Sequence, residues 1–134
     1  MGILGGIMTT TSKKITLATL TAAKRDGRKI SMLTCYDYPT AVLQAAAGVD
    51  SILVGDSYGQ VVLGYDSTLP VTMDQMVTIA SAVRRGAPKV FLIGDMPFMS
   101  YHISNAEAVR NAGRFMAEAR SEERRVGKEC RSRW

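Results

Sequence analysis

Cysteine, histidine and long apolar runs are scarce in this chain of 134 residues, which contains two cysteines and one histidine. Two cysteines do not build a disulfide framework, so we expect Cys35 to be a small buried hydrophobe in a reduced protein. No apolar stretch approaches the roughly 20 residues that a membrane span needs. The opening string "MGILGGIMTT" lacks the basic region of a signal peptide. We therefore expect a cytoplasmic protein without a membrane span, in which residues 1–13 form a disordered leader.

Nucleotide and nucleic-acid signatures are missing as well. The glycine-containing stretch "GDSYGQVVLGYDST" follows neither the G-x-G-x-x-G pattern nor the P-loop pattern, and we expect a mobile loop there. The formal net charge is +5, but 6 of the 17 Lys and Arg residues lie in residues 120–134. Because the basic excess is concentrated in this last segment, it does not indicate a nucleic-acid partner for the main body.

Apolar strings alternate with helical patterns along the rest of the chain. The spacing predicts strands at 29–35, 51–55 and 89–94, and helices at 16–27, 38–48, 73–85 and 104–119. Thr72 and Ser104 are the expected caps of the last two helices. The strands are near-continuous apolar runs, as in parallel sheets that are covered by helices. The class is therefore α/β, and both a flavodoxin-like sheet and a (β/α)₈ barrel fit this pattern.

The alternation breaks after Ala119, where a fourth strand is due. The string "RSEERRVGKECRSRW" at 120–134 is rich in Arg and has no hydrophobic period. It is either a basic tail that binds a partner or a foreign segment that replaces the native sequence. We favour the second interpretation, an unrelated basic tail of artefactual origin, because the pattern stops where a Gly and a strand should follow. Residues 14–119 then form the folded part.

Two of the predicted strands end in the same Gly-Asp pair, which places Asp56 and Asp95 just beyond them. Ligands of parallel α/β folds gather at the carboxyl ends of strands. Because adjacent strands lie about 4.7–4.9 Å apart, two such carboxylates can face one hard cation such as Mg²⁺. The alternative is that each Asp caps the loop or helix that follows. Ser57 is open to two interpretations too: a donor to a substrate carboxylate, or a local turn bond.

Three further residues after the third strand have candidate side chains. His102 is the only histidine and has no visible partner in the sequence, so we interpret it as structural. Met96 and Met99 flank "PF" and are expected to pack around the loop instead of ligating a metal.

The strings "TCYDYPTA", "ILVGDSYGQVVLGYDSTLPVTMDQM" and "VFLIGDMPFMSY" together resemble the ketopantoate hydroxymethyltransferase (3-methyl-2-oxobutanoate hydroxymethyltransferase) family, from about Lys14 to Ala119. The resemblance implies a (β/α)₈ TIM barrel of the phosphoenolpyruvate/pyruvate superfamily, of which this chain would hold a leading helix and about three βα units. It also implies a cytoplasmic homo-oligomer, expected to be a decamer, in pantothenate biosynthesis on the route to coenzyme A. Members of the family move a hydroxymethyl group from 5,10-methylenetetrahydrofolate to 3-methyl-2-oxobutanoate and form 2-dehydropantoate.

The resemblance also implies roles for individual residues. Asp56 and Asp95 would ligate Mg²⁺, Ser57 would bind the 2-oxo acid, and both Asp residues would lie close to it. Tyr58 stands where Leu is more usual in the family. We expect this departure to be tolerated.

The family's later motifs have no counterpart in these 134 residues. A Lys and a Glu in a "VKLEGG"-like string on the fourth strand, and a catalytic Glu further on, are implied by the resemblance and are not found. We therefore assign no catalytic residue and expect this chain to be inactive. Two other functions stay open: a related superfamily lyase or mutase that acts on a 2-oxo acid, and a non-catalytic fragment whose basic tail binds an acidic partner.

Overall fold

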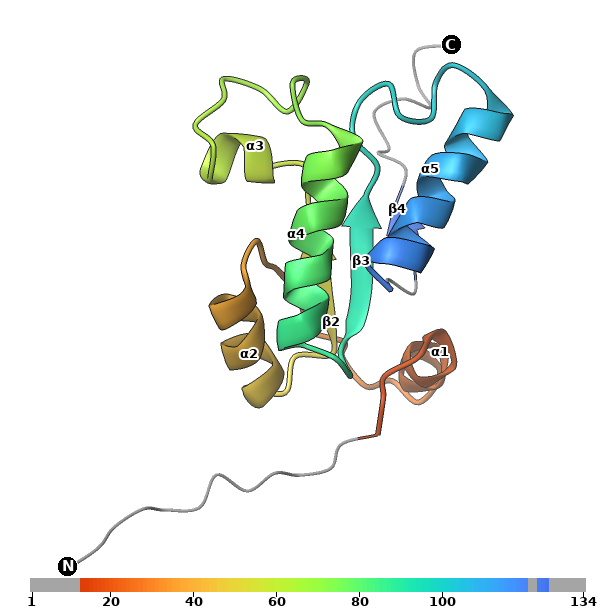
Figure 1. Ribbon diagram of the computed structural model, residues 1–134. Helices are drawn as coiled ribbons and strands as arrows, with labels where there is room; N and C mark the ends of the chain where they lie inside the picture. Colours follow the sequence, from red (N-terminus) through yellow and green to blue (C-terminus); the bar gives the residue numbers. More distant parts are fainter. Residues whose placement is uncertain (1–12, 121–122, 126–134) are drawn as a thin grey trace, which may run out of the picture.

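The computed structural model describes residues 13–120 and 123–125. Helices and strands alternate along it (Figure 1), in the order α1 (Leu17–Arg25), β1 (Met32–Thr34), α2 (Tyr38–Ala46), β2 (Ser51–Val54), α3 (Tyr58–Val61), α4 (Met73–Gly86), β3 (Phe91–Asp95), α5 (Asn105–Glu118) and β4 (Glu123–Arg125). The predicted helix and the three strand–helix units that follow it are confirmed in order, with one further short helix, α3, between β2 and α4.

The four strands form one parallel sheet with the order β1-β2-β3-β4. Figure 1 shows α2, α4 and α5 in front of this sheet and α1 beyond its lower end. Successive parallel neighbours that are joined by helices on one face are the repeating unit of an α/β fold. The predicted fold class is confirmed.

Local capping explains where the longest helices begin and end. Thr72 and Gln75 form a reciprocal capping box at the start of α4. At its other end Arg84 donates from Nη1 to the carbonyl oxygens of Ala87 and Val90, at 3.2 and 3.0 Å. Ser104 accepts a hydrogen bond from the Glu107 backbone N–H and begins α5. Both predicted caps are confirmed.

The hydrophobic core lies between the sheet and its covering helices. Ile52 and Leu92 of the strands and Met76 and Phe115 of the helices are at most 1% exposed. Phe115 packs directly on β3, because a Cβ atom at Gly94 would lie only 2.8 Å from its ring. Glycine at this position therefore sets how closely α5 approaches the sheet.

β1 differs from its prediction as a buried strand. Met32, Leu33 and Thr34 are all exposed, and the strand is three residues long. It pairs with β2 alone, so one of its edges has no neighbouring strand among the described residues. An apolar string predicts a strand that can be buried, but it does not say which element covers it. The prediction of a buried strand was wrong here for that reason.

Two short elements were not predicted. The segment after β2, expected to be a mobile loop, begins with the single-turn helix α3. β4 pairs in parallel with β3, from Ile93–Glu123 to Asp95–Arg125. β3 therefore has a paired strand on each side, because backbone pairing does not require apolar side chains. None of the described helices is long and apolar enough to cross a membrane.

Candidate functional site

The two Gly-Asp pairs lie side by side at the carboxyl ends of β2 and β3. Val54 pairs with Gly94 in the parallel register, so Gly55 and Asp95 follow at the same level of the sheet. In parallel α/β folds, ligands bind at this end of the strands. The structure therefore brings the two repeated motifs to one place, as the sequence predicted.

Gly55 leaves room for two of the predicted site residues. A Cβ atom built on it would lie 2.9 Å from Oγ of Ser57 and 3.4 Å from Oδ2 of Asp95. The two side chains come from the ends of different strands, and both approach the Cα atom of Gly55, which carries no side chain. Oδ1 of Asp95 is shielded from solvent. A hydroxyl group and a partly buried carboxylate are thus neighbours at the ends of β2 and β3.

Asp56 lies in the turn between Gly55 and Ser57 and is half-buried. Its backbone carbonyl oxygen accepts a hydrogen bond from Gly59 N–H at 3.0 Å, which closes the turn into α3. The N-cap of α3 is Ser57, not Asp56. Within the part of the chain that the structure describes, the Asp56 carboxylate makes no hydrogen bond or ion pair. The alternative interpretation of this residue as a cap is therefore not what the structure shows.

Tyr36 joins this site, although the sequence analysis gave it no role. Its phenol oxygen lies 2.8 Å from Oγ of Ser57, and its ring packs at a tilt against Tyr58 with the ring centres 6.3 Å apart. Ser57 makes no side-chain cap bond to α3, so its hydroxyl group is engaged by Tyr36 instead. The signal was present in the string "TCYDYPTA", which places a phenol two residues after β1 and therefore at the same edge of the sheet.

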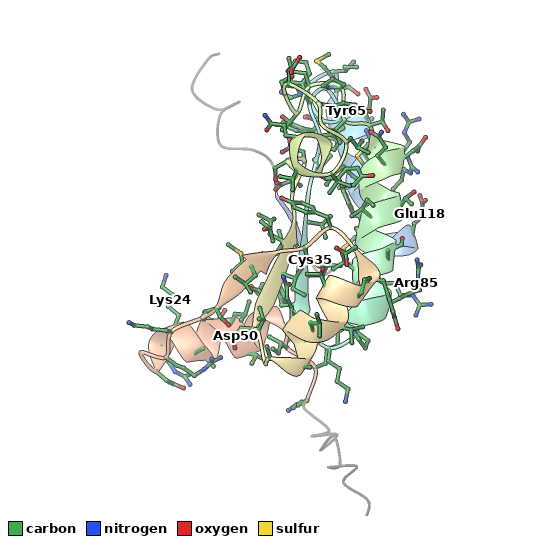
Figure 2. All side chains as sticks on the ribbon, turned by 90° about the vertical axis from the view of Figure 1, so that its left-hand side faces the viewer. Lys24, Cys35, Asp50, Tyr65, Arg85 and Glu118 are labelled. Carbon is green, nitrogen blue, oxygen red and sulfur yellow. The ribbon has the colours of Figure 1, made fainter. Side chains whose placement is uncertain are left out.

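The residues on either side of Tyr36 are structural. Asp37 caps α2, because its carboxylate accepts hydrogen bonds from Thr40 N–H at 2.7 Å and from the Thr40 hydroxyl at 2.9 Å. Cys35 is 1% exposed, and burial raises the pKa of its thiol. Figure 2 shows Cys35 between the strands and α2. The expectation of a small buried hydrophobe is confirmed, and a raised pKa argues against a reactive thiolate.

The donor atoms at this edge suit a hard cation. Asp56, Asp95 and Ser57 offer only oxygen atoms, which Mg²⁺ prefers, and Mg²⁺ commonly takes one or two carboxylates and completes its shell with substrate oxygens and water. Over the described residues, no group of three or more His, Cys, Asp or Glu side chains gathers to hold a metal ion. Two carboxylates and one hydroxyl group are the donors that these strand ends offer, a set that leaves the other positions around such an ion to water or a ligand.

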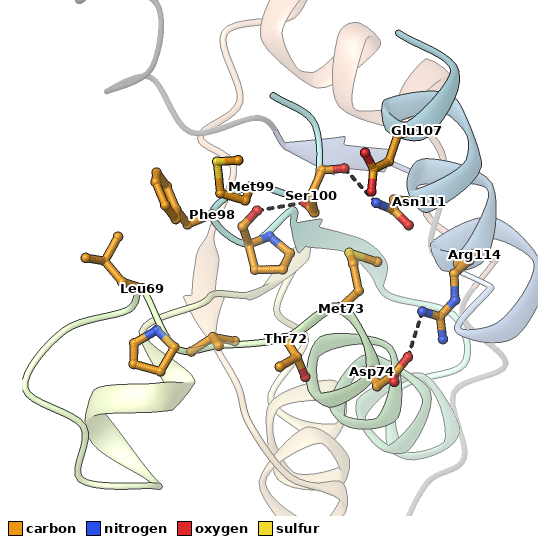
Figure 3. A pocket seen from close by; sticks show the side chains of 13 residues that line it. Leu69, Thr72, Met73, Asp74, Phe98, Met99, Ser100, Glu107, Asn111 and Arg114 are labelled. Carbon is orange, nitrogen blue, oxygen red and sulfur yellow. Dashed lines mark hydrogen bonds and ion pairs between the residues drawn. The ribbon is translucent and has the colours of Figure 1, made fainter. Parts of the chain in front are cut away.

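A pocket of about 430 Å³ opens beside this site, between the start of α4, the loop after β3 and α5 (Figure 3). Asp74 and Arg114 close one side of it through an ion pair of 2.7 Å. Asn111 donates to the carbonyl oxygen of Ser100 at 2.7 Å and fixes the loop to α5. None of the three predicted site residues lines the pocket. It is a neighbouring hollow and not the predicted site itself.

His102 and the two methionines shape the loop that follows Asp95. Nδ1 of His102 accepts a hydrogen bond from Met99 N–H at 3.1 Å, and its ring stacks on Tyr101 with the ring centres 4.1 Å apart. Met96 is 4% exposed and belongs to the core, whereas Met99 is 45% exposed. These contacts support the structural interpretation of His102 and the packing role of Met96.

Comparison with known proteins adds the family. A family model described as ketopantoate hydroxymethyltransferase matches residues 14–127. The chain belongs to the ketopantoate hydroxymethyltransferase family. It is 62% identical over 96 residues to a 3-methyl-2-oxobutanoate hydroxymethyltransferase of Geobacillus sp. (strain WCH70). The aligned residues make up 72% of this chain and 34% of that protein.

A second relative gives the same result. The chain is 56% identical over 105 residues to the 3-methyl-2-oxobutanoate hydroxymethyltransferase of Acetivibrio thermocellus. The aligned residues make up 78% of this chain and 37% of the relative. The chain therefore spans about a third of the length of the curated relatives that it matches. The predicted family is confirmed.

Solved structures identify the fold. Phosphonopyruvate hydrolase in complex with oxalate and Mg²⁺ matches 75% of this chain and 34% of its own, at a TM-score of 0.62 and 16% identity. A 2,3-dimethylmalate lyase, described as a PEP mutase/isocitrate lyase superfamily member, matches 81% of this chain and 38% of its own, at a TM-score of 0.63 and 16% identity. The structure thus shares its fold with part of these proteins, which supports the predicted partial barrel over the flavodoxin-like alternative.

The predicted domain boundaries stay predictions. The family match runs past Ala119 to residue 127, and β4 lies at Glu123–Arg125. Residues 1–12, 121–122 and 126–134 lie outside the described residues, and they include most of the predicted leader and of the predicted tail.

Proposed function

We propose that this chain provides the 2-oxo-acid and metal site of a hydroxymethyltransferase of pantothenate biosynthesis. The reaction transfers a hydroxymethyl group from 5,10-methylenetetrahydrofolate to 3-methyl-2-oxobutanoate and gives 2-dehydropantoate and tetrahydrofolate. The observation that carries the proposal is the meeting of Ser57 and Asp95 above Gly55, in a chain whose family match covers residues 14–127. Relatives with this activity in their names are 62% and 56% identical to it.

Each residue has a distinct task in this proposal. Asp56 and Asp95 hold Mg²⁺, and the Ser57 hydroxyl donates a hydrogen bond to the carboxylate of the 2-oxo acid. When bound, the ion acts as a Lewis acid on the keto and carboxylate oxygens and so favours loss of the proton from the neighbouring carbon. Asp56 suits this task because no protein group in the described part occupies its carboxylate. Burial of Asp95 Oδ1 keeps water from competing at that atom.

A general base must accept the proton from the carbon next to the ketone. None of the three site residues is free for that task, because two carboxylates are committed to the ion and the third group is a hydroxyl. The family resemblance places the base on a Glu in a motif that these 134 residues do not contain. We therefore expect the chain to bind the 2-oxo acid without turning it over.

The lyase or mutase alternative rests on the structural neighbours alone. These match at 16% identity or below and share the fold, whereas the hydroxymethyltransferase relatives match at 53–62%. The strings after β2 and β3 carry the closer likeness, and they are the strings that build the site. The non-catalytic alternative depends on residues 120–134, most of which lie outside the described residues. Cytoplasmic location and homo-oligomeric assembly, with a decamer as the expected form, belong to the same proposal.

Binding of 3-methyl-2-oxobutanoate to the 134-residue chain tests the proposal. We expect the ligand to shift the amide resonances of residues 55–57 and 95 in ¹⁵N NMR spectra, only when Mg²⁺ is present. Asp56→Asn and Asp95→Asn should each weaken this binding by at least 10-fold. The matched control is Asp26→Asn, at the exposed end of α1, which should bind as the wild type does.

A tritium-exchange assay separates binding from turnover. We expect no Mg²⁺-dependent release of tritium from 3-methyl-2-oxobutanoate labelled at C3, because the chain lacks the base. Measurable exchange that requires Asp56 would contradict the predicted inactivity. Binding that is independent of Mg²⁺, or resonance shifts elsewhere on the surface, would contradict the assignment of the site.

A further inference from the structure

The hydroxyl groups of Tyr36 and Ser57 lie together at the proposed site, and only Ser57 has been given a task. We propose that Tyr36 is a positioning residue that orients the Ser57 hydroxyl toward the ligand, so that the pair acts as one hydrogen-bond donor to the carboxylate of a 2-oxo acid. The inference rests on the proposed function for the identity of the ligand. It adds a residue that follows β1 to a site that the sequence placed at the ends of the next two strands alone.

The hydrogen-bonding capacity of the two groups supports this direction. Tyr36 Oη lies 2.8 Å from Ser57 Oγ, and either oxygen can be the donor. A hydroxyl group has one proton to donate and two lone pairs to accept with. A phenol is more acidic than an alcohol, and it is therefore the better donor of the pair. When Tyr36 donates to Ser57, the Ser57 hydroxyl keeps its own proton for a second partner, and we infer that a bound carboxylate is that partner.

The position of Ser57 shows that its hydroxyl is not needed for local structure. It occupies the N-cap of α3, where Ser usually accepts a backbone hydrogen bond, but it makes no such bond here. Its φ and ψ angles are −54° and −12°, which is helical backbone and not the extended geometry of a capping residue. The turn is closed by backbone bonds, such as Tyr58 N–H to the Gly55 carbonyl at 3.1 Å. The hydroxyl is therefore available for a ligand.

The backbone of Tyr36 is fixed on both sides. Cys35 N–H donates to the carbonyl oxygen of Leu53 at 3.0 Å, which continues the pairing of β1 with β2. Asp37 is held as the N-cap of α2 by Thr40. The ring itself packs against Tyr58, at an angle of 48° between the ring planes. An aromatic neighbour therefore supports the phenol ring of Tyr36.

Electrostatics restricts when a carboxylate can bind here. Asp95 Oδ2 lies beside the same Gly55 position as Ser57 Oγ, so an anion that approaches Ser57 also approaches a carboxylate. Two like charges at such range repel each other unless a cation lies between them. The donor pair should therefore bind a carboxylate more tightly when a divalent cation is bound at Asp56 and Asp95. The affinity for a carboxylate should therefore depend on the Mg²⁺ concentration, which can be measured.

The experiment is a double-mutant cycle on the 134-residue chain. Dissociation constants of two probes, oxalate and 3-methyl-2-oxobutanoate, are measured by ¹⁵N NMR titration at saturating Mg²⁺, for wild type, Tyr36→Phe, Ser57→Ala and the double variant. We expect Tyr36→Phe to weaken binding by about 2- to 12-fold, the range for one hydrogen bond. The double variant should bind no more weakly than Ser57→Ala alone, because Tyr36 acts through Ser57. Tyr38→Phe, which removes an exposed phenol two residues away, is the matched control and should bind normally.

A merely structural role for Tyr36 predicts a different pattern. It would lower the affinity for Mg²⁺ alone as well as for the carboxylates, whereas the positioning role leaves Mg²⁺ affinity unchanged. Losses that add in the double variant, or no loss in Tyr36→Phe, overturn the proposal. If oxalate binds through Tyr36 and 3-methyl-2-oxobutanoate does not bind, the donor pair stands and the proposed substrate fails. If neither probe shifts Ser57 although Mg²⁺ binds, the donor pair is overturned.

Discussion

The two ends of β2 each carry an aspartate, and the protein treats the two carboxylates in opposite ways. At the amino end, Asp50 accepts hydrogen bonds from Ser31 N–H and from the Ser31 hydroxyl, both at 2.9 Å, and pairs with Arg28 at 2.9 Å. At the carboxyl end, Asp56 receives no hydrogen bond or ion pair from the described residues. Side-chain bonds of Asp50 thus tie the amino end of β2 to its neighbours, and the described residues supply no such bonds to Asp56 at the carboxyl end.

The division continues on the neighbouring strands. At the amino end, Ser51 N–H and the Ser51 hydroxyl donate to the carbonyl oxygen of Ser31, so that the start of β2 is tied to the segment before β1. At the carboxyl end, the side chains that gather are Tyr36, Ser57 and Asp95, which lie at or just beyond the ends of three different strands. This is the arrangement that lets barrel enzymes vary their chemistry without changing their core.

Gly94→Ala should have the largest effect on stability, because it disturbs the packing of α5 on the carboxyl end of β3. The new Cβ atom would lie 2.8 to 3.3 Å from three atoms of the Phe115 ring, which is fully buried and cannot move away. We expect a loss of about 1–3 kcal/mol in the free energy of unfolding, measured by urea denaturation. The control is Gly113→Ala on α5, where a Cβ atom meets no other atom within 4 Å. A Gly94→Ala variant as stable as wild type would show that α5 does not pack as closely as described.

Asp50→Ala tests the amino end. It removes the acceptor of two Ser31 hydrogen bonds and the partner of Arg28, in a side chain that is 14% exposed. We expect a loss of about 1–2 kcal/mol in unfolding free energy, because the Ser31 N–H and the guanidinium are left without this acceptor. Affinity for Mg²⁺ should not change. An effect on Mg²⁺ binding that equals the effect on stability would mean that the two ends are not separate.

The pH dependence of stability sharpens the same comparison. The hydrogen bond from Ser31 N–H, assisted by the Ser31 hydroxyl and by Arg28, lowers the pKa of Asp50 below its ordinary value. A carboxyl group with a depressed folded-state pKa contributes stability above its unfolded pKa of about 3.9 and loses that contribution as the pH falls through the folded value. We expect Asp50→Asn to flatten the acid side of a plot of unfolding free energy against pH. An unchanged acid limb would contradict the assignment.

Sequence pattern predicted the elements that local chemistry specifies, and it failed where distant parts of the fold decide. The capping roles of Thr72 and Ser104 follow from residues three positions apart and were confirmed. The meeting of the two Gly-Asp pairs followed from strand order alone. The exposure of Leu33 did not, because burial of an edge strand depends on what lies beyond it. Tyr36 was missed because no sequence motif marks a single tyrosine. Its hydrogen bond to Ser57 depends on the pairing of β1 with β2, which the sequence pattern does not specify.

The smallest expected effect on stability is also the strictest test of the comparison. Asp56→Asn should change the unfolding free energy of the metal-free chain by no more than about 0.5 kcal/mol, because no described group donates to this carboxylate or pairs with it. In the presence of Mg²⁺, wild type should gain stability by mass action and Asp56→Asn should not. Thermal unfolding of both chains with and without Mg²⁺ measures the two quantities together. A metal-free Asp56→Asn chain that is clearly less stable than wild type would place a structural contact at Asp56, and the contrast with Asp50 would then be lost.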